Sequence, residues 1–390
     1  MDTVRFGVVG LGNMGSFHVE ALQSIKNAKV TAICDANPQN LERVGQKTDA
    51  KRFEKHDEML ASGLIDAVLI ATPHFLHPPI ALAAFEKGIH VLCEKPLAVT
   101  IKQGRQVLDA SAKHPNLKFA MMLQQRTMSL YRKVRELILD GELGEISRIS
   151  WIVTDWFRTW AYYGSGGWRA TWAGEGGGVL INQCPHNLDL IQWLTGLTPN
   201  RVTAVGFVGK THPIEVEDEV SAILEYANGA TGHFVTTTGE APGTNRLEIC
   251  GDRGKLIAEN GKLAFHRTRK GVREVREKSP EAFATVETWV SEIPLAPGGL
   301  SDGHRIILQN FVNAIRKDEP LLTPGTDGDK GLEIGNAMLM AGVTRKPVDL
   351  PLDGDAYEQL LKDLHKQYGG KKTLETRTVN ADMTASFQRA

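Results

Sequence analysis

The chain has 390 residues, 42% of them hydrophobic and 23% charged, and a length of this order predicts about two globular domains. Its formal net charge is −1, which excludes the basic field expected of a protein that binds nucleic acid or an acidic membrane surface. Because the sequence shows no secretory signal, no apolar run of roughly 20 residues and no CxxC pair among its four cysteines, we expect a cytoplasmic protein without a membrane span and with free thiols.

The first third of the chain alternates short β-branched runs with helical patterns. Such alternation is typical of βαβ units that build a parallel sheet. The strands expected here are Val4–Val9, Lys29–Cys34, Ala67–Ala71, His90–Cys93 and Lys118–Met122. The helices expected between them include Met14–Ile25, Pro79–Lys87 and Lys102–Lys113. We therefore predict an α/β domain with a doubly wound parallel sheet over residues 1–124.

The pattern changes from about residue 125 onwards. A helix is expected at Leu130–Leu139, followed by strands of alternating character at Glu145–Thr154, Glu219–Tyr226 and Thr231–Thr237. This order favours an α+β domain with a large open, mainly antiparallel sheet over residues 125–390. From about Gln367 the sequence is polar and aperiodic, which is typical of a frayed tail or of an arm over a neighbouring subunit.

A glycine-rich segment, Gly10-Leu11-Gly12-Asn13-Met14-Gly15, directly follows the first expected strand and opens a helical pattern. In a dinucleotide-binding turn of this kind, Gly10 makes the tight turn, Gly12 lets the backbone approach a pyrophosphate, and Gly15 lets helix and strand pack closely. The free amides at the start of the helix complete an anion site. The segment therefore predicts that the first domain is a Rossmann domain.

An acidic residue, Asp35, ends the second expected strand at the position where such domains bind the adenine ribose. Its carboxylate can accept hydrogen bonds from both ribose hydroxyls, and its charge would repel a 2′-phosphate. NAD is therefore favoured over NADP as the cofactor. The alternative, that Asp35 only starts the turn before the next helix, is compatible with ribose binding.

The segment Cys93-Glu94-Lys95-Pro96, just after the fourth of these strands along the chain, resembles the Glu-Lys-Pro hallmark of the Gfo/Idh/MocA oxidoreductases. Other segments resemble the same family in the same order over about residues 4–352. They are Ala71-Thr72-Pro73-His74 with His77, Gln124-Gln125-Arg126 with Tyr131, Gly176-Gly177-Gly178 with His186 and Asp189, Gly331-Leu332-Glu333-Ile334-Gly335-Asn336-Ala337, and Pro347-Val348.

The resemblance implies an NAD-dependent oxidoreductase whose second domain binds the substrate and forms a homodimer or homotetramer. It implies no metal, and no histidine pair here has the HExxH or a comparable ligand spacing. Fingerprint and resemblance together give the residues expected to bind the cofactor. They are Gly10, Gly12, Asn13, Met14, Gly15, Asp35, Thr72, Pro73, His77, Glu94, Lys95, Gln124, Trp168 and Arg169.

Lys95 is the first candidate for catalysis, because hydride removal from an alcohol needs a group that takes the hydroxyl proton. A lysine can do this only if burial and nearby positive charge lower its pKa by about 3 units from about 10.4. The resemblance also suggests a cis peptide bond between Lys95 and Pro96. The alternative is a surface lysine in a turn after a strand.

A second candidate group is Asn182-Gln183-Cys184-Pro185-His186, where the family usually places Asp first and His fifth. Asn182 cannot act as a base but can hydrogen-bond a substrate hydroxyl, so the proton work falls on Lys95 and His186, whose reference pKa near 6.5 suits a proton relay. Pro185 is expected to delay the start of the helix His186–Leu194. His186 as a core histidine is the alternative.

An aromatic segment contains five of the seven tryptophans, at positions 151, 156, 160, 168 and 172. Flat rings offer apolar faces to sugar C–H groups, while Arg, Asp and Tyr hydroxyls bind the oxygens. A core or subunit interface is the alternative for any single ring. The residues expected to contact the substrate are Lys95, Arg126, Asp155, Trp156, Arg158, Tyr162, Tyr163, Arg169, Asn182 and His186.

These features favour an NAD-dependent dehydrogenase that oxidises a ring hydroxyl of a sugar, glycoside or cyclic polyol, with carbon 3 suggested by the resemblance. One alternative is a glycosidase on the same scaffold, in which NAD is reduced and reoxidised within one turnover. The other is a non-catalytic sensor that binds the nicotinamide cofactor, which the Asn182 and Pro185 departures keep open.

Overall fold

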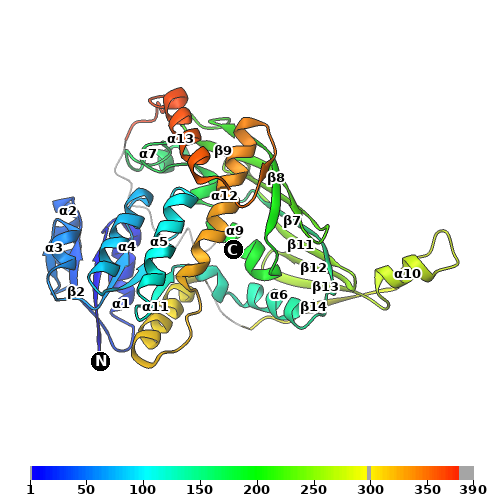
Figure 1. Cartoon of the computed structure of the whole chain (residues 1–390), viewed down its shortest axis with the longest axis horizontal. Coiled ribbons are helices and arrows are strands. Elements are labelled where there is room, and N and C mark those ends of the chain that lie inside the picture. The colour runs from blue at the N-terminus through cyan, green and yellow to red at the C-terminus, as the bar shows by residue number, and fades with distance from the viewer. Residues whose placement is uncertain (1, 297–299, 377–390) are drawn as a thin grey trace.

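The computed structural model describes residues 2–296 and 300–376 (Figure 1). Its first layer is a six-stranded sheet in the order β3-β2-β1-β4-β5-β6, with every pair parallel. This is the strand order of a doubly wound Rossmann sheet. The strands are β1 (Val4–Val9), β2 (Ala28–Cys34), β3 (Lys51–Phe53), β4 (Ala67–Ile70), β5 (His90–Cys93) and β6 (Phe119–Met121).

The strands of this sheet are buried on both faces. In β4, Leu69 packs into one hydrophobic cluster while Val68 and Ile70 pack into another, as alternating side chains of a covered parallel strand do. The elements that connect the strands are α1 (Asn13–Leu22), α2 (Pro38–Gly45), α3 (His56–Leu60), η1 (His74–Leu76), α4 (His77–Glu86) and α5 (Ile101–Lys113). The doubly wound architecture expected from the sequence is confirmed.

A late helix, α11 (Leu300–Lys317), returns to this first layer. Its Ile307, Leu308 and Phe311 lie in the same hydrophobic cluster as β1, and the rings of Phe311 and Phe6 are 6.2 Å apart. The first layer therefore includes a segment that the sequence division at residue 124 assigns to the second domain, and that division stays a prediction.

The second layer is a nine-stranded sheet in the order β14-β13-β12-β11-β7-β10-β9-β8-β15. All pairs are antiparallel except β7 with β10, so the expected mainly antiparallel sheet is confirmed. The strands are β7 (Ile146–Val153), β8 (Pro199–Val208), β9 (Glu217–Tyr226), β10 (Thr231–Thr237), β11 (Asn245–Gly251), β12 (Gly254–Glu259), β13 (Lys262–Thr268), β14 (Thr288–Ile293) and β15 (Val348–Asp349).

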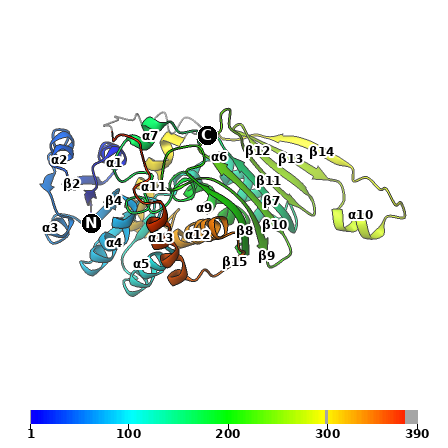
Figure 2. The same ribbon diagram turned by 90° about the horizontal axis from the view of Figure 1, so that it is seen from above.

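Helices cover one face of the second sheet, and the other face is open (Figure 2). The covering helices include α6 (Ser129–Leu139), α9 (Pro185–Thr195) and α12 (Gly328–Thr344), whose apolar residues share one cluster with the sheet. The remaining elements are η2 (Gln124–Thr127), α7 (Trp160–Gly164), α8 (Val179–Asn182), α10 (Val272–Lys278), η3 (Gly325–Asp327) and α13 (Gly354–Tyr368). In the described ranges, no helix has the length and apolar character needed to cross a membrane.

Element ends differ little from the expected ones. Helix α1 ends at Leu22 and not at Ile25, because the amides of Ser24 and Ile25 already form tighter turns to Ala21 and Leu22. Pro185 occupies the first turn of α9, where the missing amide proton of proline costs nothing. The helix therefore begins at Pro185, one residue before the expected His186, and Gln183 and Cys184 separate it from α8.

Candidate functional site

The glycine turn between β1 and α1 has the geometry of a pyrophosphate site. Gly10 has a positive φ of 86°, and a Cβ on Gly15 would lie 1.7 Å from the carbonyl oxygen of Gly10. A Cβ on Gly12 would meet nothing within 4 Å. Gly12 is the N-cap of α1, and no side chain caps the helix there, so the first amides of the helix are free to bind an anion.

Asp35 lies beside this turn at the end of β2. Its carboxylate accepts hydrogen bonds from the amides of Leu11 (2.6 Å) and Asn37 (2.7 Å). The residue is only partly buried, so its oxygens remain accessible to a ribose. Arg43, which the sequence did not single out, braces the turn through the Leu11 carbonyl oxygen at 2.6 Å.

The loop after β4 joins the glycine turn to the Lys95–Pro96 peptide. His77 contacts the carbonyl oxygens of Pro96 (2.7 Å) and Thr72 (2.8 Å) through its two ring nitrogens. The hydroxyl of Thr72 is buried and has no hydrogen-bond partner in the described part of the chain, although buried polar groups normally have one. This unsatisfied hydroxyl next to the turn is consistent with the expected cofactor contact.

Glu94 is a buried carboxylate in the loop after β5. His18 of α1 contacts its Oε1 at 2.7 Å. Burial alone would raise the pKa of Glu94, but the hydrogen bond and charge of His18 outweigh it and lower the pKa to about 2. Glu94 is therefore ionised at all working pH values, directly before Lys95.

Lys95 projects from the loop after β5 toward the second domain, and its peptide bond to Pro96 is cis, as expected. Its Nζ donates a hydrogen bond to the main-chain oxygen of Asn182 at 2.7 Å. Burial lowers the pKa of Lys95 from its usual value; Glu94 opposes this shift, and Arg169 adds to it. The lowered pKa raises the fraction of neutral amine that can accept a proton.

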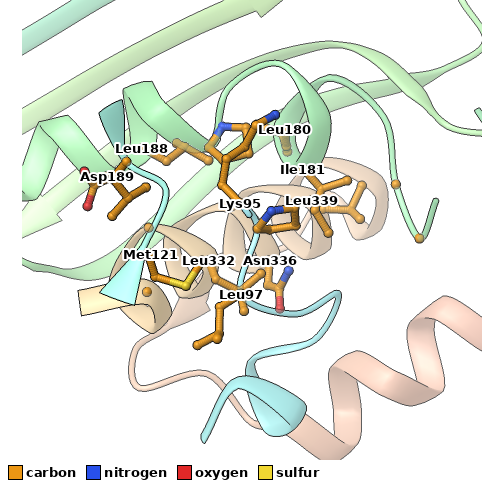
Figure 3. Close-up of a pocket in the computed structure, with 18 of the residues that line it drawn as sticks. Lys95, Leu97, Met121, Leu180, Ile181, Leu188, Asp189, Leu332, Asn336 and Leu339 are labelled. Carbon is orange, nitrogen blue, oxygen red and sulfur yellow. The ribbon is translucent and has the colours of Figure 1, made fainter. Parts of the chain in front are cut away.

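An apolar cavity accounts for the low-dielectric surroundings of Lys95. A mainly apolar cavity adjoins Lys95, and Figure 3 shows side chains that line it, contributed by the loop after β5, by β6, and by helices α8, α9 and α12. Its apolar lining includes Leu97, Met121, Leu180, Ile181, Leu188, Leu332 and Leu339. Such walls disfavour the charged form of an amine.

Asn182, at the end of α8, connects Lys95 to the aromatic segment. Its Oδ1 accepts a hydrogen bond from the hydroxyl of Tyr162 (3.2 Å), and that hydroxyl accepts one from Nη1 of Arg169 (2.8 Å). The guanidinium of Arg158 lies 4.9 Å from the centre of the Tyr162 ring. Lys95, Asn182, Tyr162 and Arg169 thus form one connected polar group.

His186, one turn after Asn182, is 5% exposed. Its Nε2 lies 3.0 Å from Nε2 of Gln124, so the amide donates and the ring proton resides on Nδ1. Nδ1 has no partner among the described residues. Burial, assisted by the charge of Lys95, lowers the pKa of His186 to about 3. His186 is therefore a neutral hydrogen-bond donor, not the half-protonated group that its reference pKa suggests.

A sequence profile described as an oxidoreductase family with an NAD-binding Rossmann fold matches residues 4–121, and the profile of the GFO/IDH/MocA C-terminal domain matches residues 131–257. Together they cover well over half of the chain. The chain belongs to the Gfo/Idh/MocA family. It is an oxidoreductase with an NAD-binding domain, and the expected cofactor is confirmed.

Individual relatives of the family agree over nearly the whole length. Inositol 2-dehydrogenase of Rhizobium meliloti is 24% identical over 89% of this chain and 99% of its own. Levoglucosan dehydrogenase of Pseudarthrobacter phenanthrenivorans is 26% identical over 90% and 99%. Among solved structures, the WlbA dehydrogenase of Bordetella pertussis, in complex with NADH and UDP-GlcNAcA, has a TM-score of 0.74 and 28% identity over 90% of this chain and 100% of that one.

Several expected substrate residues of this Gfo/Idh/MocA chain do not join the Lys95 group. The guanidinium of Arg126 is engaged in ion pairs with Asp189 (2.5 Å) and Asp327 (2.7 Å). The hydroxyl of Tyr163 is buried on Thr238 at 2.8 Å, and Asp155 accepts a hydrogen bond from the Asn245 amide at 3.2 Å. These contacts tie the three side chains to other residues of the chain.

The tryptophans divide between several environments. Trp151 and Trp172 are buried in the core of the second domain, and Trp160 is 61% exposed. Trp156 lies under the guanidinium of Arg158 (5.4 Å), and Trp168 meets the ring of His74 edge-on at 5.8 Å. Trp156 and Trp168 therefore remain candidates for ligand contact.

Two buried carboxylates in the site were missed. Glu175 is 2% exposed and contacts both Asn182 and Arg169. Glu217 accepts hydrogen bonds from the amides of Gly178 (2.8 Å) and Leu180 (3.1 Å), and burial raises its pKa to about 7. The signal for Glu175 was present, since it is an isolated acid directly before three glycines in a segment otherwise rich in apolar residues.

Proposed function

We propose that this protein is an NAD-dependent dehydrogenase that oxidises a ring hydroxyl of a sugar, glycoside or cyclic polyol. The observation that carries the proposal is the placement of Lys95, whose amine lies between the carboxyl edge of the parallel sheet and the hydrogen-bonding side chains of the second domain. Ligands of open α/β sheets bind at this edge. Curated relatives named as inositol and levoglucosan dehydrogenases support this substrate class.

The described residues fit the cofactor. The turn at Gly12 and the start of α1 would hold the pyrophosphate, Asp35 the adenine ribose, and Thr72 and Glu94 the nicotinamide half. When bound, NAD accepts the hydride from the alcohol carbon. Gly12 supports this assignment because the space above it is open, which close approach of a phosphate requires.

The chain supplies the proton chemistry and the positioning. Lys95 Nζ receives the hydroxyl proton, since its lowered pKa gives it neutral amine. His186 donates a hydrogen bond from Nδ1 to the oxygen being oxidised, and Asn182, Tyr162 and Arg169 bind neighbouring hydroxyls. Positioning of this kind can remove several kcal/mol of the barrier. Carbon 3 of the ring is the position that the family resemblance favours.

The test is reduced-nicotinamide absorbance after mixing the protein and NAD with a panel of inositols, free sugars and alkyl or aryl glucosides. The proposal predicts sustained NADH with at least one compound, and analysis of the product identifies the oxidised carbon. Release of the aglycone without accumulated NADH would indicate the glycosidase. NADH binding without turnover on any compound would support the sensor.

We also propose that two copies pair through the open face of the nine-stranded sheet. Ile152, Val205 and Ile223 are each more than 40% exposed on this face. Register brings them together, because Ile152 pairs with Val235, Val235 with Ser221, and Ser221 with Val205 across four strands. Exposed apolar patches of this kind mark interaction sites. Light scattering of the wild type and of Ile223→Glu tests the pairing, since the variant should shift toward monomer.

A further inference from the structure

The buried carboxylate of Glu175 holds the centre of the polar group around Lys95. Its Oε2 accepts a hydrogen bond from the amide of Ala170 at 2.6 Å, and its Oε1 accepts one from Nδ2 of Asn182. Nη1 of Arg169 lies 3.6 Å from the same Oε1. A carboxylate that is 2% exposed and has three such partners is fully engaged, which is the condition for keeping a buried charge.

The contacts of Glu175 fix the direction of the hydrogen bonds in this polar group. An arginine only donates hydrogen bonds and an ionised carboxylate only accepts them. Arg169 therefore donates to the Tyr162 hydroxyl, that hydroxyl donates to Oδ1 of Asn182, and Nδ2 of Asn182 donates to Glu175. If residue 175 were an amide, it could donate as well as accept, and the side chain of Asn182 could turn over.

Asn182 is also the residue that Lys95 contacts through its main-chain oxygen. Asn182 is thus the one residue that separates Glu175 from the amine of Lys95, which accepts the proton. The carboxylate of Glu175 also offsets the positive charge of Arg169. Its charge raises the pKa of Lys95, against the lowering by burial. Burial raises the pKa of Glu175 itself, with Arg169 as the main opposing charge.

We propose that Glu175 is a positioning residue that orients the side-chain amide of Asn182 and balances the charge of Arg169 beside Lys95. The inference rests on the proposed role of Lys95 as proton acceptor. It also accounts for an amide at position 182, because a carboxylate there would face Glu175 directly. The contact between positions 175 and 182 therefore contains one carboxylate, that of Glu175.

Other charged groups lie near Lys95 and Glu175 and also affect the pKa values of this site. Arg158 and Arg169 lower the pKa of Lys95, and Glu94 raises it. Glu217 and Lys372 also feel the charge of Glu175.

Burial favours the neutral form of three neighbouring histidines. Burial lowers the pKa values of His74, His186 and His304, and the charge of Lys95 contributes to each shift. Protonation changes at Lys95 can therefore be read separately from these rings.

The experiment titrates Lys95 by NMR of the protein carrying ¹³C-labelled lysine, with Lys95→Ala identifying the signal. In Glu175→Gln, Arg169 loses its counter-charge, and the pKa of Lys95 should fall by about one unit. In Asn182→Asp, a second carboxylate is added, and the pKa should rise. The double variant Glu175→Gln/Asn182→Asp exchanges the two groups and should return the pKa toward the wild-type value.

The matched control is Glu215→Gln, a buried carboxylate near the same segment that accepts a hydrogen bond from the Gly370 amide at 2.8 Å and does not contact Asn182. It should leave the pKa of Lys95 unchanged. An unchanged pKa in Glu175→Gln would overturn the proposal. If Glu175→Gln does not fold, as judged by Tm and NADH fluorescence, Asn182→Asp alone decides, and no upward shift there overturns it.

The NMR titration needs no substrate, so it separates this inference from the proposed function. If no sugar is oxidised but Lys95 titrates as stated, the proposed function fails, while the charge balance between Glu175, Arg169 and Lys95 stands. If sugar is oxidised, the acid limb of kcat/KM against pH should move with the NMR value in all three variants. A uniform loss of activity without such movement would assign Glu175 a merely structural role.

Discussion

Lys95 and Asn182 are joined by a hydrogen bond of 2.7 Å from the lysine Nζ to the asparagine main-chain oxygen. The bond crosses from the parallel sheet to the second domain, so the proposed proton acceptor and the proposed substrate-binding side chains are held in one geometry. It also shows why Asn at position 182 is compatible with this site. The contact with Lys95 uses the backbone, and the side chain is left to the network of Glu175 and Tyr162.

Two glycines of the cofactor turn should respond differently to alanine. Gly12→Ala should fold with a nearly unchanged Tm, because its Cβ meets nothing within 4 Å, but the methyl group should block the pyrophosphate and weaken NADH binding at least tenfold. Gly15→Ala should be strongly destabilised, because its Cβ would lie 1.7 Å from the Gly10 oxygen. Calorimetry and NADH fluorescence measure both. A stable Gly15→Ala, or a Gly12→Ala that binds normally, would contradict the assignment.

Asp35 should set the preference for NAD over NADP. Asp35→Ser should weaken NADH binding by roughly 10- to 100-fold, since hydrogen bonds to a charged group contribute about 1.5–3 kcal/mol, and should weaken NADPH binding less or improve it. The exposed Asp49→Asn serves as the control. Equal losses for both cofactors would mean that Asp35 acts only by holding the Leu11 amide.

The fold and the cofactor half of the site were predictable because their signals are local. The glycine turn, Asp35 and Lys95 each lie directly after a strand, where position in the sequence fixes position in space. Glu175 stands directly before three glycines, but its contact with Asn182 could not be predicted, because it depends on how the aromatic loop folds back on α8. The return of α11 to the first sheet was likewise hidden, since an amphipathic helix does not specify which sheet it covers.

Histidine burial should make stability depend on pH. The folded pKa of His186 is about 3 and that of His304 about 4, below the unfolded value near 6.5. The unfolded chain therefore binds more protons, and stability should be lost as pH falls from about 6.5 toward 4. For His186 the loss at pH 4 is at most about 3 kcal/mol.

His186→Gln tests this dependence against the exposed His233→Gln. The Tm of the wild type and of the control should fall steeply between pH 6.5 and 4, and that of His186→Gln should fall less. Parallel curves for all three proteins would show that His186 is not buried in the neutral form.

The described end of the chain should tune sugar binding. Nζ of Lys372 donates hydrogen bonds to the main-chain oxygens of Arg169 (2.7 Å) and Gly166 (3.2 Å), so the segment after α13 holds the loop that carries Arg169. Lys372→Met should raise the KM for the sugar several-fold, because the loop that carries Arg169 loses this support. The exposed Lys366→Met is the matched control. An unchanged KM in Lys372→Met would show that the loop keeps its position without this contact.

The most direct test of the account compares NADH formation by the wild type, Lys95→Ala and the exposed-lysine control Lys87→Ala on the best substrate of the panel. Loss of a general base typically costs 10²- to 10⁴-fold in rate. We predict a loss of this size in Lys95→Ala, with NADH binding and Tm retained, and wild-type rates in Lys87→Ala. A Lys95→Ala protein that forms NADH within a few-fold of the wild type would contradict the assignment of Lys95 as the proton acceptor.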